Sequence, residues 1–447
     1  MASEIARFTE YKETGPALFS KNGHQIQATF RVAPIHVTVA NTLRRQILAA
    51  VPTVGFKTEP PEASDVKIQT NTTPLVNEML MHRLGMIPIV VENPAEFNPD
   101  EHEFRINVEN VGQTSVNVTA SDIQVYKLNA NGTETLLSNT DFFPPDPITN
   151  QTALITVLRK RYNMDTPPEK LTLKARASVS TGRVNMRYSP VSQCSYEYTR
   201  DTSKERETAL FLRWLAVSKK VPDVQKISTE FADELRREYD CMEIQRCYLQ
   251  NENGEPYDFT FHLESVGVFS VQTIIERGLK ACEDLVSLYV AMDTELPVGA
   301  NSVVINRSAT RAGGFEFVFQ NQEHTLGNLL QTFLMDRHVD GVEEPRLAYA
   351  GYKVPHPLRQ EMVVVVSPLD GMEATAIKAI ANVAQYLKGY FSTLLRSWQE
   401  MSTTEVQQTQ QTQQTQQTQP VQVQTQQTQE PVGKPAPKTR AKKTTKA

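Results

Sequence analysis

The stretch that decides the fold occurs twice: residues 38–43 are TVANTL, and residues 325–330 are TLGNLL. Each copy follows a segment of alternating aromatic or β-branched residues and continues with apolar residues at helical spacing. The copies differ just beyond the motif, because Arg44-Arg45 follows the first and Gln331-Thr332 follows the second. The repeat predicts two related units that pack on each other, with a basic helix face in the first unit alone.

Length and composition limit the classes of protein to which the chain can belong. The 447 residues can form two or three domains with real cores, and 39% hydrophobic with 22% charged residues is typical of globular proteins. No apolar run is long enough to span a membrane, and the first ten residues contain no charged, apolar leader. Four cysteines without a Cys-x-x-Cys pair favour buried, reduced thiols. We therefore expect a soluble, intracellular protein with no membrane partner.

The formal charge of −5 is unevenly distributed, since a lysine-rich tip follows residue 433 and leaves the rest of the chain more acidic. An acidic body is not expected to bind nucleic acid non-specifically. The basic tip could contact nucleic acid or a nuclear-import receptor, or simply solubilise the chain. Both interpretations stay open.

Local patterns predict the main elements. Alternation over 25–32 indicates a strand, and Thr38 is the expected N-cap of a helix that ends near Ala50. Thr73-Pro74 should open a second helix that ends at Gly85, followed by a strand over 86–91. Long apolar stripes predict helices over about 271–292 and 372–400.

Composition changes mark further segments. Short alternating runs rich in Asn, Thr, Pro and Val predict a small β-rich domain over 92–170, and charged sequence with helical spacing predicts helices within 200–249. After Met401 the chain becomes Gln/Thr repeats and then a Lys/Pro/Ala tip. Such sequence cannot form a core, so we expect disorder there.

No pattern of catalytic residues emerges. The chain has no Gly-rich phosphate loop, nucleophile elbow or His-Glu-x-x-His motif, and no Asp-rich magnesium cluster. His324 and His356 lack further ligands at metal-site spacing, so local hydrogen bonding is the expected role of His324. We predict no catalytic residue, no metal and no cofactor. Arg44-Arg45 is either a solvated helix face or a docking contact for a protein carboxylate or carbonyl.

Several motifs together resemble the assembly subunits of cellular RNA polymerases. Part of the chain is similar to the α-type subunits, namely bacterial α, archaeal D and the third subunit of RNA polymerase II. The motifs are 39–45 (VANTLRR), 51–53 (VPT), 82–88 (HRLGMIP), 118–123 (VTASDI), 173–177 (LKARA), 188–191 (YSPV) and 259–267 (FTFHLESVG). The last third resembles the smaller partner, archaeal L or the eleventh subunit of RNA polymerase II, through 323–330 (EHTLGNLL) and 350–358 (AGYKVPHPL).

The resemblance implies an α+β fold with two α-subunit-type dimerisation units, each an antiparallel sheet with packed long helices. The expected D-like unit comprises 1–55 and 172–300, with a β-rich inserted domain at 56–171 and a helical insertion at about 200–255. An L-like unit at 301–401 and a disordered tail at 402–447 complete the chain. The third-subunit family often has a cysteine cluster in the inserted domain, and residues 92–170 contain none, so we expect no metal there.

The resemblance also implies roles for particular residues. The expected dimerisation core consists of Leu43, Ile47, Leu326, Leu330, Leu334, Leu387, Phe391 and Leu394. The expected subunit-docking residues are Arg44, Arg45, Leu48, His82, Arg83, Ile87 and Pro88. The first half should dock the second-largest, β-like polymerase subunit, and the L-like half should face the largest, β′-like subunit. Small polymerase subunits are further expected partners, and DNA is contacted only through the complex.

The resemblance thus implies a non-catalytic subunit of a DNA-directed RNA polymerase. A fused chain of this kind resembles the arrangement in large DNA viruses that encode their own polymerase. It would then act in the host nucleus or a cytoplasmic viral factory, and packaging in the virion stays open. The rival hypotheses are a stand-alone architectural or regulatory protein that reuses the α-subunit fold and a metal-dependent enzyme without a known motif.

Overall fold

The computed structural model describes residues 6–17, 25–129, 131–161, 163, 165–221, 228–309 and 313–417. The chain separates into a compact unit, Met1–Ser402, and a second unit, Thr403–Ala447. All contacts below lie in the first unit.

The first half of the repeat is a four-stranded antiparallel sheet with two helices. Its strands follow the spatial order β1-β2-β13-β12, so β12 and β1 are the edges. The elements in chain order are β1 (Arg7–Ala17), β2 (Gln25–Ala33), α1 (Val37–Ala49), β12 (Val191–Tyr198), β13 (Phe259–Ser265) and α6 (Val271–Ser287).

The second half repeats this topology. Its sheet has the order β14-β15-β17-β16, and again one helix follows the second strand and another follows the fourth. The elements are β14 (Val303–Arg307), β15 (Phe315–Gln320), α7 (His324–Leu334), a π-helical turn (Met335–Val339), β16 (Leu347–Lys353), β17 (Glu361–Pro368) and α8 (Glu373–Gln417). The alternating phenylalanines of β15 are all buried, as a strand packed on one face requires.

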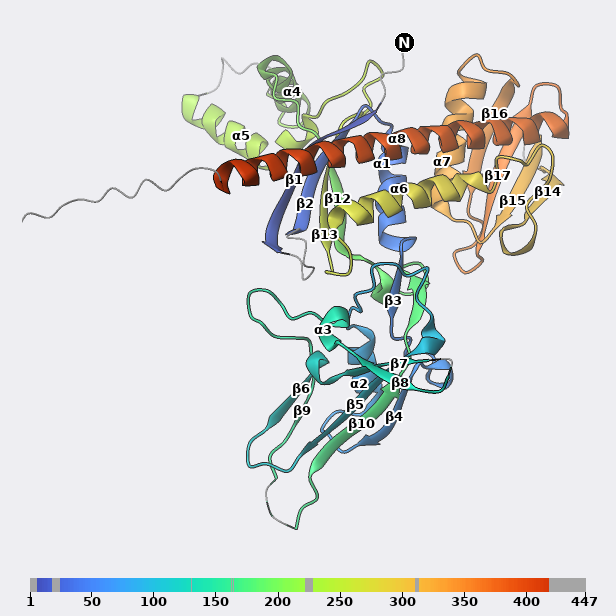
Figure 1. Cartoon of the computed structure of the whole chain (residues 1–447). Helices are drawn as coiled ribbons and strands as arrows, with labels where there is room; N and C mark the ends of the chain where they lie inside the picture. The colour runs from blue at the N-terminus through green and yellow to red at the C-terminus, as the bar shows by residue number, and fades with distance from the viewer. Residues whose placement is uncertain are drawn as a thin grey trace, which may run out of the picture. The chain divides into compact units, whose positions relative to one another are not determined.

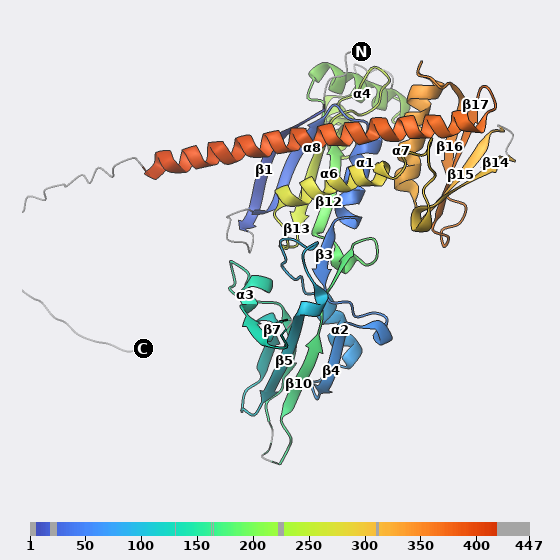
Figure 2. The same ribbon diagram turned by 45° about the vertical axis from the view of Figure 1, so that its right-hand side comes forward.

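One hydrophobic core runs through both halves. Trp398 on α8 lies edge-on to Phe8 and Tyr11 of β1, with ring centroids 5.2 and 5.4 Å away. Tyr289, just after α6, packs edge-on against Phe319 of β15 at 5.1 Å. In both ribbon views α8 runs beside α6 across the first sheet (Figure 1 and Figure 2). The last helix of the second half therefore helps to cover the sheet of the first half.

A β-rich segment is inserted between α1 and β12 and has its own hydrophobic core. It contains a five-stranded sheet, β4-β10-β5-β7-β8, and two-stranded sheets β11-β3 and β6-β9. Its strands are β3 (Pro52–Gly55), β4 (Val66–Asn71), β5 (His102–Asn110), β6 (Val116–Thr119), β7 (Gln124–Leu128), β8 (Glu134–Leu137), β9 (Leu154–Leu158), β10 (Glu169–Ala175) and β11 (Ser178–Thr181), and its helices are α2 (Asn77–Gly85) and α3 (Asn139–Phe142).

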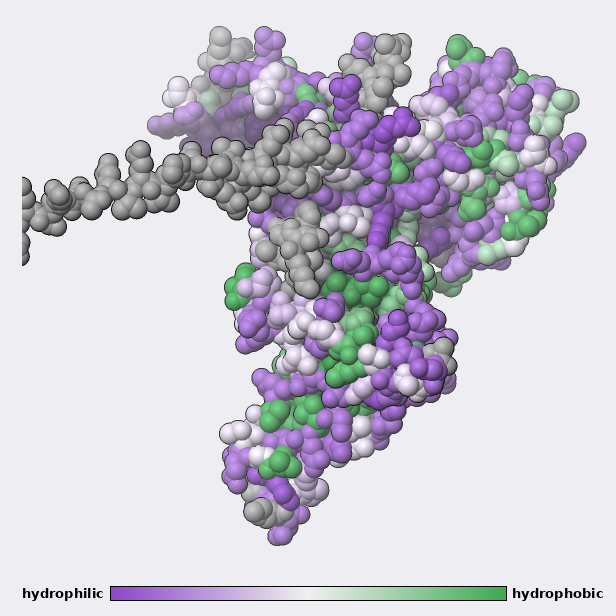
Figure 3. Space-filling view, in the orientation of Figure 1, coloured by the Kyte–Doolittle hydropathy of each residue, from purple (hydrophilic) through white to green (hydrophobic). Residues whose placement is uncertain are grey.

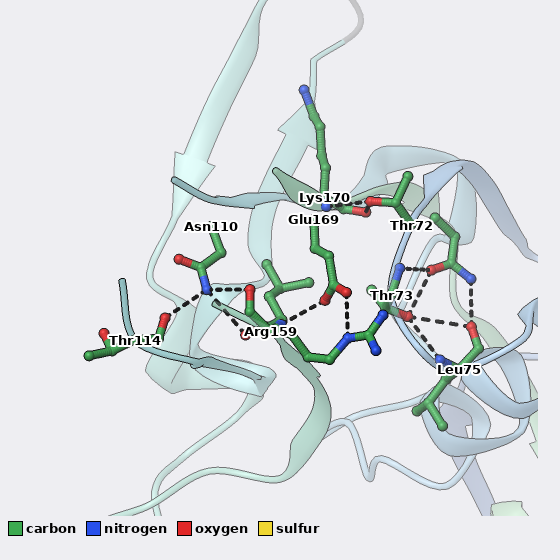
Figure 4. A network of polar contacts seen from close by, with 10 residues as sticks. Thr72, Thr73, Leu75, Asn110, Thr114, Arg159, Glu169 and Lys170 are labelled. Atoms are coloured by element: carbon green, nitrogen blue, oxygen red, sulfur yellow. Dashed lines mark hydrogen bonds and ion pairs between the residues drawn. The ribbon is translucent and has the colours of Figure 1, made fainter. Parts of the chain in front are cut away.

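Polar contacts join the small β6-β9 sheet to the larger sheet (Figure 4). The Asn110 amide nitrogen donates to the carbonyls of Thr114, Leu158 and Arg159 at 2.8–3.2 Å. Glu169 accepts from both the backbone and the side chain of Arg159. Asn110 is almost fully buried, so its amide loses its hydrogen bonds to water. The three bonds to carbonyl groups compensate for that loss.

A second insertion, between β12 and β13, is helical, as predicted for 200–249. It contains α4 (Lys204–Val217) and α5 (Thr229–Met242). Tyr239 of α5 packs between Phe211 and Trp214 of α4, with ring centroids 5.2 and 5.6 Å away. These aromatic contacts hold the two helices together.

Two expected helix starts were wrong. The N-cap of α1 is His36, whose Nδ1 accepts from the Thr38 amide at 3.1 Å, so Thr38 lies inside the helix. The next helix, α2, begins at Asn77 rather than at Thr73-Pro74. Here the Asn71 side chain accepts from the Thr73 amide and donates to the Leu75 carbonyl, which holds the intervening residues in a turn.

Other expectations differ at element ends. The strand expected over 86–91 is absent apart from an isolated bridge at Ile89, because the Ile87 and Val90 amides bond singly to Leu84 and Phe142. The helix expected to reach 292 ends at Ser287, and β1 was not predicted. The last helix continues to Gln417, beyond its expected end, and so includes 402–417 of the tail that was expected to be disordered over 402–447; residues 418–447 lie outside the described residues.

Two helix glycines offer a matched test of the packing. A Cβ on Gly278 of α6 would collide with Ile47 of α1, whereas one on Gly389 of α8 would meet nothing within 4 Å. We expect Gly278→Ala to lower the free energy of unfolding by about 1–3 kcal/mol through overpacking. Gly389→Ala should raise it by about 0.5–1 kcal/mol through helix propensity. Denaturant melts of both variants measure this, and equal effects of the two would contradict the close α1–α6 packing.

Candidate functional site

Helices α1 and α7, which carry the repeated motif, contact each other at both ends. The Thr38 and Thr332 hydroxyls lie 3.3 Å apart, and Arg45 Nε donates to the Thr325 hydroxyl at 2.5 Å. In the repeat, Thr38 corresponds to Thr325 and Arg45 corresponds to Thr332. Exchanging the two copies therefore converts one contact into the other, which is the pattern of an isologous, twofold-like interface.

The residues expected to form the dimerisation core all lie in the one hydrophobic cluster shared by the two halves. Each is at most 2% exposed: Leu43, Ile47, Leu326, Leu330, Leu334, Leu387, Phe391 and Leu394. Side chains from α1, α7 and α8 thus meet in a single apolar interior.

Arg45, expected to dock a partner, makes its contacts within the chain. Its guanidinium pairs with Glu323 at 3.1 Å, and Arg183 approaches the other oxygen of that carboxylate at 3.2 Å. Arg183 also donates to the Asn321 carbonyl. Since these groups are partly exposed, the ion pairs contribute about 1 kcal/mol or less each. Their main effect is to orient α1 against the start of α7.

Arg44 has a different environment from Arg45. Its Nε and Nη2 both donate to the Asn41 side-chain oxygen, at 3.1 and 3.0 Å. Arg44 and Asn41 line a hollow of about 440 Å³ together with residues 194–198 of β12. Burial raises the pKa of the Cys194 thiol to about 12, a shift that the positive charge of Arg44 opposes. The thiol is therefore protonated at neutral pH and is not a nucleophile.

The remaining expected docking residues divide into exposed and buried ones. His82, Arg83 and Pro88 are exposed, Leu48 is half-buried, and Ile87 belongs to the core of the inserted segment. Arg83 donates to the Leu154 carbonyl at 2.7 Å. Pro88 and Ile87 line a small hollow distinct from the one beside Arg44, so the structure does not gather all docking residues into one site.

Our sequence analysis did not single out two exposed methionines near the turn at residues 82–88. Met79 is 59% exposed and Met86 is 63% exposed. Met79, His82 and Arg83 have the spacing i, i+3, i+4, which places them on one face of α2, and Met86 is the C-cap of that helix. That spacing is visible in the sequence. Apolar surface gathers in the region of β3 and α3 in the space-filling view as well (Figure 3).

The histidines considered as metal ligands bond locally. His324 Nδ1 lies 3.3 Å from the Tyr352 hydroxyl, and His356 Nδ1 accepts from the Leu358 amide at 3.1 Å. Within the described ranges, no group of three or more His, Cys, Asp or Glu residues is placed to hold a metal ion. In the same part of the chain, every helix is too short or too polar to cross a membrane.

Two parts of the chain match family models of known proteins. Residues 29–125 and residues 315–397 each match a family model described as the RNA polymerase Rpb3/Rpb11 dimerisation domain. The first match begins within β2 and includes α1; the second extends from β15 into α8.

Individual relatives agree with the family models. The chain is 26% identical to the DNA-directed RNA polymerase II subunit RPB3 of Schizosaccharomyces pombe over 290 residues, 60% of this chain and 85% of that protein. It is 26% identical to the DNA-directed RNA polymerases I and III subunit rpac1 of Dictyostelium discoideum, over 57% of this chain and 75% of that protein. It is 25% identical to the archaeal subunit Rpo3 of Methanosphaera stadtmanae, over 38% of this chain and 57% of that protein. This single chain therefore carries two RNA polymerase Rpb3/Rpb11 dimerisation domains and is homologous to the RPB3 and Rpo3 subunits of DNA-directed RNA polymerases.

Proposed function

We propose that this protein is a non-catalytic assembly subunit of a multisubunit RNA polymerase, in which two halves pack as a heterodimer within one chain. The D-like half comprises 1–55 and 172–300, interrupted by the inserted domain at 56–171, and the L-like half comprises 301–401. The observation that carries the proposal is the pair of exchange-related contacts between α1 and α7, Thr38 with Thr332 and Arg45 with Thr325. Two matches to one dimerisation-domain family support it.

Fusion has a clear energetic benefit for an assembly subunit. Two separate chains lose translational and rotational freedom when they associate, whereas linked halves meet at a high effective concentration. The link also fixes their ratio at one to one. The platform for the large subunits is then present as soon as one chain has folded.

The proposed docking surface for the β-like subunit lies on the D-like half and on its inserted domain. Arg44, Leu48 and the turn from His82 through Arg83 and Ile87 to Pro88 contact the second-largest, β-like subunit. Arg45 supports this surface by holding α1 against Glu323. The L-like half faces the largest, β′-like subunit, small polymerase subunits complete the assembly, and DNA is reached only through the complex.

The fused arrangement fits a virus-encoded polymerase, with transcription in the host nucleus or a cytoplasmic viral factory.

The paired-halves model predicts a specific loss of stability. Leu330 of α7 is fully buried, so Leu330→Ala should lower the free energy of unfolding by roughly 2–5 kcal/mol. The control Leu358→Ala removes a side chain that is 88% exposed and should change stability by about 0.5 kcal/mol or less. Chemical denaturation of the purified chain measures both. Unchanged stability of the Leu330→Ala chain would refute the shared core.

The assembly role is tested by tagged purification from the cells in which the gene is naturally expressed, with a high-salt wash. We expect two very large subunits in near-equal amount with the tagged chain. Recovery of the chain alone would refute the assembly role and favour a stand-alone architectural protein with the same fold.

The docking role of α2 is tested by a double substitution. His82→Ala with Arg83→Ala removes exposed side chains and the exposed hydrogen bond from Arg83 to Leu154, so the free energy of unfolding should fall by about 1 kcal/mol or less. Capture of the β-like subunit should weaken about ten-fold or more, as expected when central interface contacts are lost. Arg213→Ala, at an exposed position of α4, is the matched control. Equal capture by both variants would exclude this face of α2 from the interface.

A further inference from the structure

The two halves differ in whether a side chain bonds to the outward backbone N–H of the edge strand. In the second half, the Gln331 side-chain oxygen accepts a hydrogen bond from the Tyr352 amide at 3.0 Å. Tyr352 lies on β16, the edge strand of its sheet. An outward backbone N–H of that edge is thereby satisfied within the chain, which blocks the addition of another strand at this point.

The corresponding edge strand of the first half is β12, and its register is the same. A bulge separates the pairs Val191–Ser265 and Gln193–Glu264, just as one separates Leu347–Pro368 and Tyr349–Ser367.

Beyond the bulge, Tyr196 pairs with Phe261 where Tyr352 pairs with Val364. Tyr196 is therefore the structural counterpart of Tyr352. The shared register implies that its N–H points out of the sheet edge in the same way.

The residue that could close this edge is Arg44, the counterpart of Gln331 in the repeat. A guanidinium has five N–H donors and no acceptor, so Arg44 cannot accept a hydrogen bond from Tyr196. Among the described residues, Arg44 is bonded to the Asn41 amide oxygen and to no carboxylate. In the part of the chain that the structure describes, no side chain closes β12 at Tyr196, and a cation lies beside it; the chain's own pairing begins just beyond the strand, where the Leu249 amide donates to the Thr199 carbonyl.

The hollow at this point has the form of a strand-binding groove. Five consecutive residues, 194–198, line it, and since successive side chains of a strand alternate between faces, the hollow follows the strand's edge. Asn41 and Arg44, one helical turn apart on α1, form the other wall. Glu197 also lines the hollow and lies 3.3 Å from His262 on β13.

We infer that an extended segment of a partner polymerase subunit adds to β12 as a fifth strand and places a carboxylate on Arg44. The inference rests on the proposed assembly function and specifies its mode of contact. Backbone hydrogen bonds to the open edge supply the attachment, and the Arg44 pair fixes the register of the added strand. The L-like half cannot bind in this way, because Gln331 already occupies the equivalent edge position.

The edge is tested first by hydrogen–deuterium exchange with residue-level mass spectrometry. In the free full-length chain, the Tyr196 amide should exchange faster than the Tyr352 amide. In the complex purified with both large subunits, Tyr196 should be slowed about ten-fold or more. The free Gln331→Arg chain is the internal check, since exchange at Tyr352 should become faster. An unchanged Tyr352 rate in that variant would overturn the assignment of Gln331 as the closing group.

Two substitutions at Arg44 test the charge and the open edge together. Arg44→Gln supplies the acceptor that the second half uses and removes the charge, so capture of the partner subunit should fall about ten-fold or more. Arg44→Lys keeps the charge and provides no acceptor, so most of the capture should remain. Equal loss in both variants would overturn the proposed role of the open edge.

The carboxylate is identified with a carbodiimide, which joins an amine to a neighbouring carboxylate without a spacer. In the complex formed by the Arg44→Lys chain, the introduced amine should link to an Asp or Glu in an extended segment of another subunit. A link to Glu197 alone would overturn the proposal.

The outcomes also distinguish this inference from the function on which it rests. Co-purification of the large subunits with unprotected Tyr196 overturns strand addition and leaves the assembly role intact. Failure of the large subunits to co-purify overturns both.

Discussion

Where α1 crosses α7, the two halves of the chain bury side chains that neither half could bury alone. Leu43 and Leu330 enter the same interior, and polar contacts close the crossing at both ends. Trp398 on α8 then packs against aromatic residues of the opposite sheet. A change in the α1–α7 crossing would move α8 as well, so the two sheets are held in one relative position by a single shared core.

The apolar stripes that line this interior are visible in the sequence because their signal is local, whereas their pairing across the two halves was implied only by the resemblance. Leu326, Leu330, Leu387 and Phe391 lie at helical spacing in long apolar stripes, and helical stripes of this length seldom form anything else. The strand β1 was missed because charged residues interrupt its alternation, and its pairing with β2 comes from the sheet rather than from its own residues. The start of α2 was missed because a single side chain, Asn71, holds the preceding residues in a turn.

The docking residues were harder to place for a different reason. Arg44 and Arg45 are neighbours in sequence, and nothing in the sequence separates their roles. Their environments differ because Glu323, from the other half of the chain, pairs with Arg45, whereas Arg44 bonds to Asn41. Contacts of this kind, between segments far apart in the chain, cannot be predicted from residue spacing. The position of Met79 on the same helix face as His82 and Arg83 could have been predicted from spacing.

Both insertions lie in the first half, so the second half keeps the bare topology of the repeat. The position of α8 has a consequence for how the protein is made. Phe8 and Phe30 belong to β1 and β2, yet Trp398, which packs against both, is translated long after these strands. At typical elongation rates β1 and β2 wait roughly tens of seconds for Trp398. The nascent chain must therefore shield an incomplete core until α8 has been made, and a product truncated before α8 leaves both halves unfinished.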